Sequence, residues 1–117
     1  MKLFIFLLIL IGSLACTVPC HAGGYCAIAY SVHTGRYGYS DGYSSRALAE
    51  TRALESCGIW DARIAGWGHN SYVALARGNG SAWGCGVAPT LALAESRALH
   101  FCPPPNAHIV KWVYSFD

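Results

Sequence analysis

Cysteines are the residues of this sequence with the clearest capacity for covalent chemistry. Four of them, Cys26, Cys57, Cys85 and Cys102, lie beyond the apolar amino-terminal segment. An even number of cysteines in a short exported chain is typical of a disulfide framework. Structural zinc sites place their ligands in close pairs such as Cys-x-x-Cys, and no two of these four are that close. The sequence therefore predicts disulfides at these positions and no metal site.

Carboxylates and histidines are the next candidates for chemistry. Glu50 and Glu95 occupy equivalent places in two similar segments, and paired carboxylates can perform acid–base catalysis. A carboxylate copied into both halves is more simply structural, bonding backbone donors of its own unit or an arginine. The four histidines beyond the amino-terminal segment show no His-x-x-x-His spacing, and a Cys–His nucleophile would require a reduced cysteine. We therefore predict structural carboxylates at both positions, no catalytic residue and no cofactor.

Aromatic residues are numerous for so short a chain, which has seven tyrosines and four tryptophans. Some must fill the core, and Tyr37 and Trp83, each followed by glycine, are expected to pack in the core or against the hairpin. Trp60 has no aromatic counterpart in the second half of the chain, where Pro105 stands at the matching place. Exposed aromatic side chains favour contacts with proteins or sugars. Trp60 is therefore the candidate binding aromatic.

An internal repeat organises all of these residues. The segment RALAETRALESC at residues 46 to 57 returns as LALAESRALHFC at residues 91 to 102. The similarity extends in both directions, so that the two units cover about residues 25 to 68 and 72 to 115. Each unit is predicted to contain a strand, a second strand, a helix and a third strand.

Local signals support these elements. Cys26, Ile28 and Tyr30 alternate with small residues, as in a strand, while the Ala, Leu, Glu and Arg of residues 46 to 57 are good helix formers. Serine at 44 or 45 and Thr90 can cap the two helices, and Gly58 and the prolines from 103 onward can end them. The sequence predicts an α+β domain, a mainly antiparallel sheet with two helices on one side.

Three disulfide pairings are possible for four cysteines. A twelve-residue helix carries its terminal cysteine roughly 18 Å from its start. If the two helices lie side by side on one face, Cys57 and Cys102 meet at one pole of the domain and Cys26 and Cys85 at the other. This arrangement favours the pairs Cys26–Cys85 and Cys57–Cys102, whereas Cys26–Cys57 or Cys85–Cys102 would link each repeat internally.

The first 22 residues are expected to be a secretory signal peptide. Lys2 precedes an apolar run and then small residues, whereas a membrane-spanning helix needs about 20 apolar residues. Cleavage after Ala22 is favoured, with cleavage after Ala15 or a lipid-anchored Cys16 as alternatives. Residues 23–117 then form one domain, which we expect to be periplasmic or secreted and not stably inserted in a membrane.

The charge of the chain is small, with a formal net value of +2 at pH 7. Neither a basic stripe nor a block of like charges is present in the sequence. This balance gives no support for binding to nucleic acid or to an anionic membrane.

The motifs Gly-Arg-Tyr-Gly-Tyr-Ser and Ser-Arg-Ala-Leu-Ala-Glu in the first unit, with Ala-Trp-Gly-Cys-Gly in the second, resemble a bacterial family. It is the domain-of-unknown-function family numbered 4189. The resemblance implies an exported bacterial domain and transfers no catalytic residue. Such domains often carry a cysteine after each helix and another before the Ala-Leu-Ala strand, where this chain has Asp61, Asn106 and Tyr72. The family's disulfide pairings therefore do not transfer to this chain.

These observations favour a small, disulfide-stabilised binding or interaction module over an enzyme. Its expected partner is another protein outside the cytoplasm. The alternative is a small hydrolase or enzyme inhibitor directed at the cell wall. A hydrolase would need Glu50, Glu95 and a histidine around one open pocket.

Overall fold

Eight elements follow one another in residues 23–117, the part of the chain that the computed structural model describes. The expected signal peptide and its cleavage sites lie outside the described residues. The strands and helices are Tyr25–Tyr30 (β1), Tyr37–Tyr43 (β2), Arg46–Cys57 (α2), Arg63–His69 (β3), Ser71–Arg77 (β4), Trp83–Ala88 (β5), Leu91–Phe101 (α3) and His108–Ser115 (β6).

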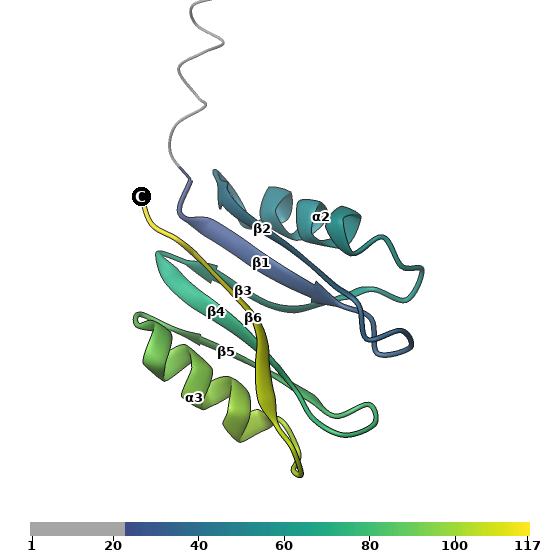
Figure 1. Ribbon diagram of the computed structural model, residues 1–117. Coiled ribbons are helices and arrows are strands. Elements are labelled where there is room, and N and C mark those ends of the chain that lie inside the picture. Colours follow the sequence, from purple (N-terminus) through teal and green to yellow (C-terminus); the bar gives the residue numbers. More distant parts are fainter. Residues whose placement is uncertain (1–22) are drawn as a thin grey trace, which may run out of the picture.

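The strands form two antiparallel sheets of three strands, one from each repeat (Figure 1). The first has the order β2-β1-β3 and the second the order β5-β4-β6. In each sheet the central strand comes first in the chain, and a helix connects the two outer strands across it. The α+β class and the two tandem strand-strand-helix-strand repeats are thus confirmed, with the strands divided between two sheets rather than joined in one.

Each helix packs on its own sheet through a stripe of small residues. Ala49, Ala53 and Cys57 are buried on α2, and Ala94 and Ala98, followed by Cys102, are buried on or beside α3. These positions recur every four residues, so they lie on one face of the helix. The caps are those expected, since Ser45 Oγ accepts a hydrogen bond from Leu48 N and Thr90 Oγ1 accepts one from Leu93 N.

Glycines on the second strand of each repeat allow the helix backbone to lie directly against that strand. A Cβ atom built on Gly38 would lie 2.0 Å from Cys57 N, and one on Gly84 would lie 2.5 Å from Ala98 O. Gly86 faces Ala94 in the same manner. At the equivalent position of the first repeat stands Ser40, whose hydroxyl donates to Ala49 O at 2.6 Å.

The other face of each sheet carries larger apolar side chains, and the two sheets pack against each other through them. Cys26, Ile28 and Tyr30 from β1 meet Val73 and Leu75 from β4 in this central core. Four layers result, in the order α2, first sheet, second sheet, α3 (Figure 1). The smaller residues of the central strands, such as Ala27 and Ala74, face the outer helices.

The position of the helices corrects one expected disulfide. Cys57 belongs to the cluster between α2 and the first sheet, and Cys102 to the cluster between α3 and the second sheet. Both sheets therefore lie between these two cysteines, and the pairing Cys57–Cys102 is wrong. It rested on two helices lying side by side, whereas they cover opposite outer faces of the molecule.

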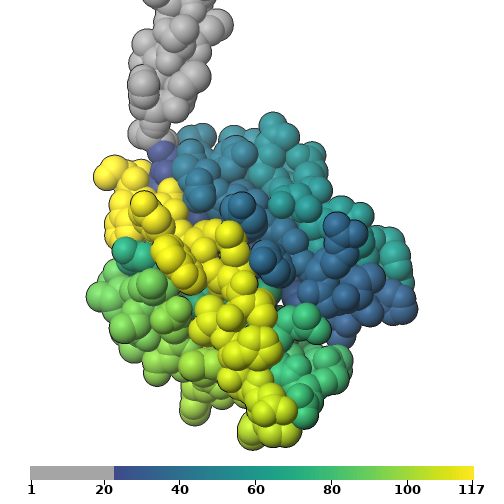
Figure 2. Space-filling view, viewed as in Figure 1, coloured from purple at the N-terminus to yellow at the C-terminus, as the bar shows by residue number. Residues whose placement is uncertain are grey.

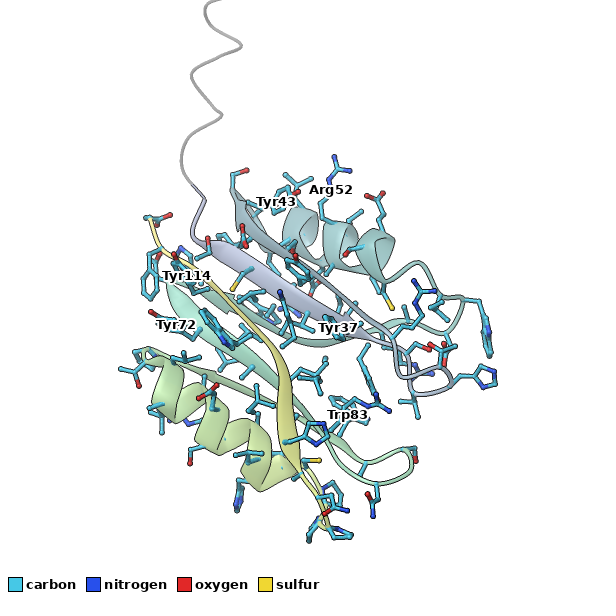
Figure 3. The ribbon with its side chains drawn as sticks, viewed as in Figure 1. Tyr37, Tyr43, Arg52, Tyr72, Trp83 and Tyr114 are labelled. Carbon is cyan, nitrogen blue, oxygen red and sulfur yellow. The ribbon has the colours of Figure 1, made fainter. Side chains whose placement is uncertain are left out.

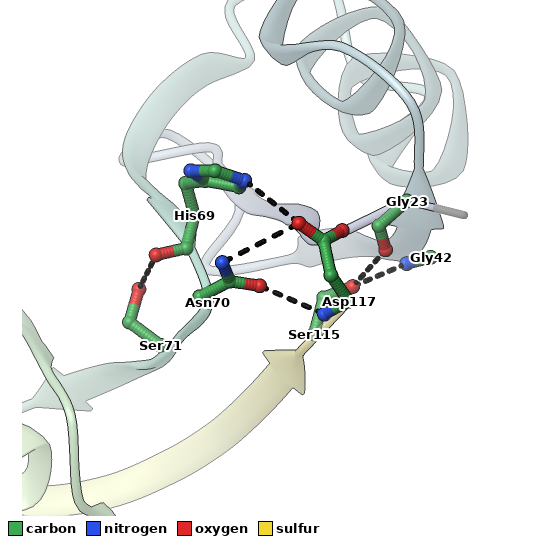
Figure 4. A network of polar contacts seen from close by, with 7 residues as sticks. All are labelled: Gly23, Gly42, His69, Asn70, Ser71, Ser115 and Asp117. Carbon is green, nitrogen blue, oxygen red and sulfur yellow. Dashed lines mark hydrogen bonds and ion pairs between the residues drawn. The ribbon is translucent and has the colours of Figure 1, made fainter.

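A polar network joins the two ends of the described chain (Figure 4). Ser115 Oγ donates to Gly23 O at 2.7 Å and accepts from Gly42 N at 3.0 Å. Asp117 N donates to Asn70 Oδ1 at 2.8 Å. The carboxyl-terminal strand of the second repeat is thereby attached to the start of the first repeat.

Within residues 23–117, neither helix combines the length and the apolar character that crossing a membrane requires.

Candidate binding site

A hollow of about 480 Å³ opens at the end of the sandwich where three strands of the two sheets meet. Its walls include Tyr30, the last residue of β1, Arg63, the first of β3, and Trp83, the first of β5. Trp60 and Asp61 from the loop between α2 and β3 form its rim. The remaining lining is apolar and comes from Val32, Ile64 and Ala65. Figure 3 labels Trp83 at this end, with Tyr72 and Tyr114 toward the other.

Three of the residues that line the hollow, Tyr30, Trp60 and Trp83, are aromatic. The rings of Tyr30 and Trp83 lie 5.8 Å apart between centroids, and Tyr30 is almost completely buried. Trp60 is 84% exposed, the most exposed of the large apolar residues described, and its only aromatic neighbour there is His33 at 5.8 Å. The hollow thus contains two packed aromatic rings, Tyr30 and Trp83, and one indole, that of Trp60, which is almost fully exposed to solvent.

Asp61 holds the loop that carries Trp60. Its carboxylate accepts a hydrogen bond from Ser31 Oγ at 2.6 Å and one from His33 N at 3.2 Å. The hydrogen bond from Ser31 is the main reason why the pKa of Asp61 lies below its ordinary value. The carboxylate therefore stays ionised and ties the rim of the hollow to the end of β1.

Two buried polar atoms near this hollow have no hydrogen-bond partner in the described chain. They are the hydroxyl of Tyr30 and Nε of Arg77. The Arg77 guanidinium carbon lies 5.9 Å from the centre of the Tyr30 ring. Most buried polar groups are paired, so these two atoms are exceptions in the described chain, and the Tyr30 hydroxyl is covered rather than open to the hollow.

Trp60 is thus the one residue predicted from sequence that lies at the hollow. Tyr30 and Trp83 were missed as site residues because their apolar neighbours and strand positions indicate core packing. Trp83 does pack on the core, as expected, but its ring also forms a wall of the hollow.

The two predicted structural carboxylates lie far from this hollow and from each other. Glu50 is on α2 and pairs with Arg46, whose Nε donates to Glu50 Oε2 at 3.0 Å. Glu95 is on α3, on the opposite outer face, and has no hydrogen bond or ion pair within residues 23–117. The structure therefore does not bring Glu50 and Glu95 together around one pocket.

The four candidate disulfide cysteines are free thiols in two kinds of surroundings. Cys57 and Cys102 end the small-residue stripes of the two helices. Cys26 and Cys85 lie in or against the central core. Burial raises the pKa of Cys26 to about 11, and burial followed by the nearby Cys26 raises the pKa of Cys85 to about 12. Both central thiols are therefore uncharged and poor nucleophiles at neutral pH.

The histidines are dispersed over the described part of the molecule. His69 stacks on Tyr25 with 4.3 Å between ring centroids, and its Nε2 lies 3.4 Å from Asp117 Oδ2. His33 stands beside Trp60, and His108 contacts the carbonyl of Asn106. Residues 23–117 contain no group of three or more His, Cys, Asp or Glu side chains placed to hold a metal ion.

Comparison with curated proteins finds relatives in mycobacteria. Protein Rv1269c of Mycobacterium tuberculosis and Protein Mb1300c of Mycobacterium bovis are each 42% identical to this chain over 77 residues. The matches cover 64% of this chain and 58% of each relative, so the chain spans less than two thirds of their length. No solved structure matches the chain. The family model for the domain of unknown function DUF4189 matches residues 25–114, which include both repeats, and the chain belongs to this family.

Proposed function

We propose that this protein is an exported binding module whose hollow receives an apolar side chain of a partner protein. The observation that carries this proposal is the 84% exposed Trp60 at the rim of an aromatic hollow of about 480 Å³. Tryptophans of this kind supply much of the free energy of association when a partner covers them. The volume is sufficient for one large apolar side chain.

The polar groups around the hollow suit such an interface. Asp61 and Arg63 line the hollow and provide charged groups beside its apolar walls. Protein interfaces commonly combine an apolar centre with a polar rim.

Binding is favoured over hydrolysis by the placement of the carboxylates. A hydrolase would need an acid and a base on either side of one substrate, and Glu50 and Glu95 lie on helices at opposite faces of the molecule. Asp61, the carboxylate at the hollow, accepts hydrogen bonds from Ser31 and His33, and no second carboxylate from residues 23–117 lines the hollow with it.

Export is the second part of the proposal, and it is supported by the charged, apolar and small-residue regions of residues 1–22. In an oxidising compartment we expect Cys26 and Cys85 to form a disulfide that links the two sheets through the central core. Peptide mapping without reductant would test the bond. Amino-terminal sequencing should find Gly23 first, and an acylated Cys16 at the start would contradict this cleavage site.

The binding proposal is tested by capturing partners from periplasmic or culture fluid with the wild-type protein and with Trp60→Ala. The control is Phe116→Ala, which removes another exposed aromatic ring at the far end of the second sheet. A partner that uses the hollow is retained by wild type and by Phe116→Ala and lost by Trp60→Ala. Titration of the purified partner should then show at least a tenfold weaker Kd for Trp60→Ala. Equal affinity for all three proteins would refute the role of the hollow.

A further inference from the structure

The first repeat contains an arginine held between a carboxylate and an indole ring. Arg46 is the first residue of α2, and its guanidinium carbon lies 4.2 Å from the centre of the Trp67 ring. Its Nε donates to Glu50 Oε2 at 3.0 Å. A cation stacked on an indole face and paired with a carboxylate is a favourable arrangement for a guanidinium group.

The second repeat has the same carboxylate and indole without the arginine. Glu95 is the fifth residue of α3, as Glu50 is of α2. Trp112 stands opposite Ala74 in its sheet, as Trp67 stands opposite Ala27 in the other. Leu91 occupies the position of Arg46. The second repeat therefore keeps two parts of the guanidinium site and lacks the third.

The surface beside Glu95 and Trp112 is hollowed. A hollow of about 530 Å³ is lined by Glu95 and Trp112, together with Ile109, Val110 and Lys111. Trp112 is 41% exposed, whereas Trp67 is only partly exposed beneath Arg46. Figure 2 shows the yellow carboxyl-terminal segment, which includes β6, lying open at the surface beside the green α3.

The cations nearest in the chain are used elsewhere. Arg97 on α3 donates from Nη1 to Val87 O at 2.6 Å. The ammonium group of Lys111 lies 3.8 Å from the centre of the Tyr39 ring, which belongs to the other sheet. Within residues 23–117, no cationic side chain stacks on Trp112 and no donor pairs with Glu95.

We propose that Glu95 and Trp112 form a binding site for the guanidinium group of an arginine side chain supplied by a partner peptide or protein. The guanidinium would stack on Trp112 and donate to the Glu95 carboxylate, as Arg46 does in the first repeat. A lysine ammonium is a compact charge without the planar face, so it fits this pair of groups less well. The site lies on α3 and β6, and it is independent of the hollow at Trp60.

The test is a titration of the protein with the peptide acetyl-Gly-Arg-Gly-amide, followed by NMR of the four indole N–H signals. The signal of Trp112, assigned with Trp112→Phe, should shift and saturate. The corresponding citrulline peptide has nearly the same shape as the arginine peptide but no charge. The corresponding lysine peptide has the positive charge but no planar guanidinium group. We expect the citrulline peptide to bind at least tenfold more weakly and the lysine peptide to lie between the two.

Three variants separate this site from nonspecific attraction. Leu91→Arg restores the arginine of the first repeat and should abolish saturable binding by filling the site. Leu93→Arg, the matched control, adds the same charge at an exposed position of α3 and should leave Kd within about twofold of wild type, because surface charges interact weakly. Glu95→Gln should weaken binding roughly tenfold.

The proposal also predicts the converse change in the first repeat. Arg46→Leu should expose a second site, so that the arginine peptide shifts the Trp67 indole signal as well. Equal binding of the arginine and citrulline peptides, or unchanged binding in folded Leu91→Arg, would overturn the proposal. So would the absence of a saturable Trp112 shift in wild type.

Discussion

Replacing Gly84 by alanine should destabilise the protein strongly, because this glycine lets α3 lie directly on β5. A Cβ atom at this position would lie 2.5 Å from Ala98 O and 2.5 Å from Cys102 N. Both are backbone atoms of the helix or its cap, so no side-chain rotation can relieve the contact. The helix would have to move away from the strand, which would loosen the packing of Ala94 and Ala98 as well.

The expected magnitude follows from this packing. Overpacking a core costs about 1–3 kcal/mol, and a contact with helix backbone belongs at the upper end of that range. Alanine returns about 0.5–1 kcal/mol because it restricts the unfolded chain more than glycine does. The free energy of unfolding should therefore fall by about 2 kcal/mol. For a domain of this size the loss lowers Tm by roughly 8–16 °C.

Thermal and urea unfolding followed by far-ultraviolet circular dichroism measure this loss. The matched control is Gly80→Ala, in a turn where no other atom lies within 4 Å of the added Cβ. Its φ of 64° makes alanine cost about 1 kcal/mol through backbone strain alone. If Gly84→Ala proved no more destabilising than Gly80→Ala, the close approach of helix and strand would not have the energetic role assigned to it.

Three further changes test other parts of the structure. Folding raises the pKa of Cys85 to about 12 and that of Cys26 to about 11, so the reduced native state keeps protons that the unfolded state loses. The free energy of unfolding should therefore fall between about pH 9 and pH 12, and it should fall less steeply in Cys85→Ala. Parallel pH profiles of wild type and Cys85→Ala would contradict this. Ser115→Ala should cost about 1–3 kcal/mol in urea unfolding, since two backbone groups lose their partner, and a silent substitution would show that the network of Figure 4 is dispensable. Glu50→Ala should lower the free energy of unfolding by less than about 1 kcal/mol, because an exposed ion pair contributes little. Glu95→Ala should lower it by about 0.5 kcal/mol or less, because Glu95 has no partner in the described chain. A loss above about 2 kcal/mol in either variant would indicate a buried hydrogen bond instead.

The sequence is sufficient to predict the elements of each repeat because the local signals agree with one another. Capping residues at Ser45 and Thr90 and a left-handed Gly58 delimit the helices, and both helices use alanines at four-residue intervals. Because the pattern recurs in the second repeat, each element is predicted twice from independent residues. These features depend on neighbours within a few residues, which is why a single sequence contains them.

The division into two sheets could not be read from the same signals. Both faces of β1 are apolar, with Ala27 and Ala29 on one side and Ile28 and Tyr30 on the other. This pattern shows that both faces are buried, but it does not show whether a helix or another sheet covers the larger residues. The answer depends on how one repeat meets the other, and the prediction of helices on one side of a single sheet led to the wrong pairing of Cys57 with Cys102.

The sequence indicated candidate site residues only where the two repeats differ from each other. Trp60 was singled out because its counterpart is Pro105, and it is the most exposed apolar side chain described. The same reasoning applies to Arg46 and Leu91, although the significance of that difference required the contacts with Trp67 and Glu50.

Duplication explains why such differences are informative. Residues that both halves need for folding, such as the helix alanines and the first glycine of the second strand, stay alike because each half packs its helix in the same way. When one repeat has a side chain bound by neighbouring groups and the other repeat keeps those groups without the side chain, the groups form a possible binding site. The side chain in the first repeat then indicates which chemical group such a site would bind. In this protein the displayed occupant is an arginine side chain, stacked on Trp67 and paired with Glu50. The chemistry proposed for Glu95 and Trp112 therefore follows from the molecule's own first repeat.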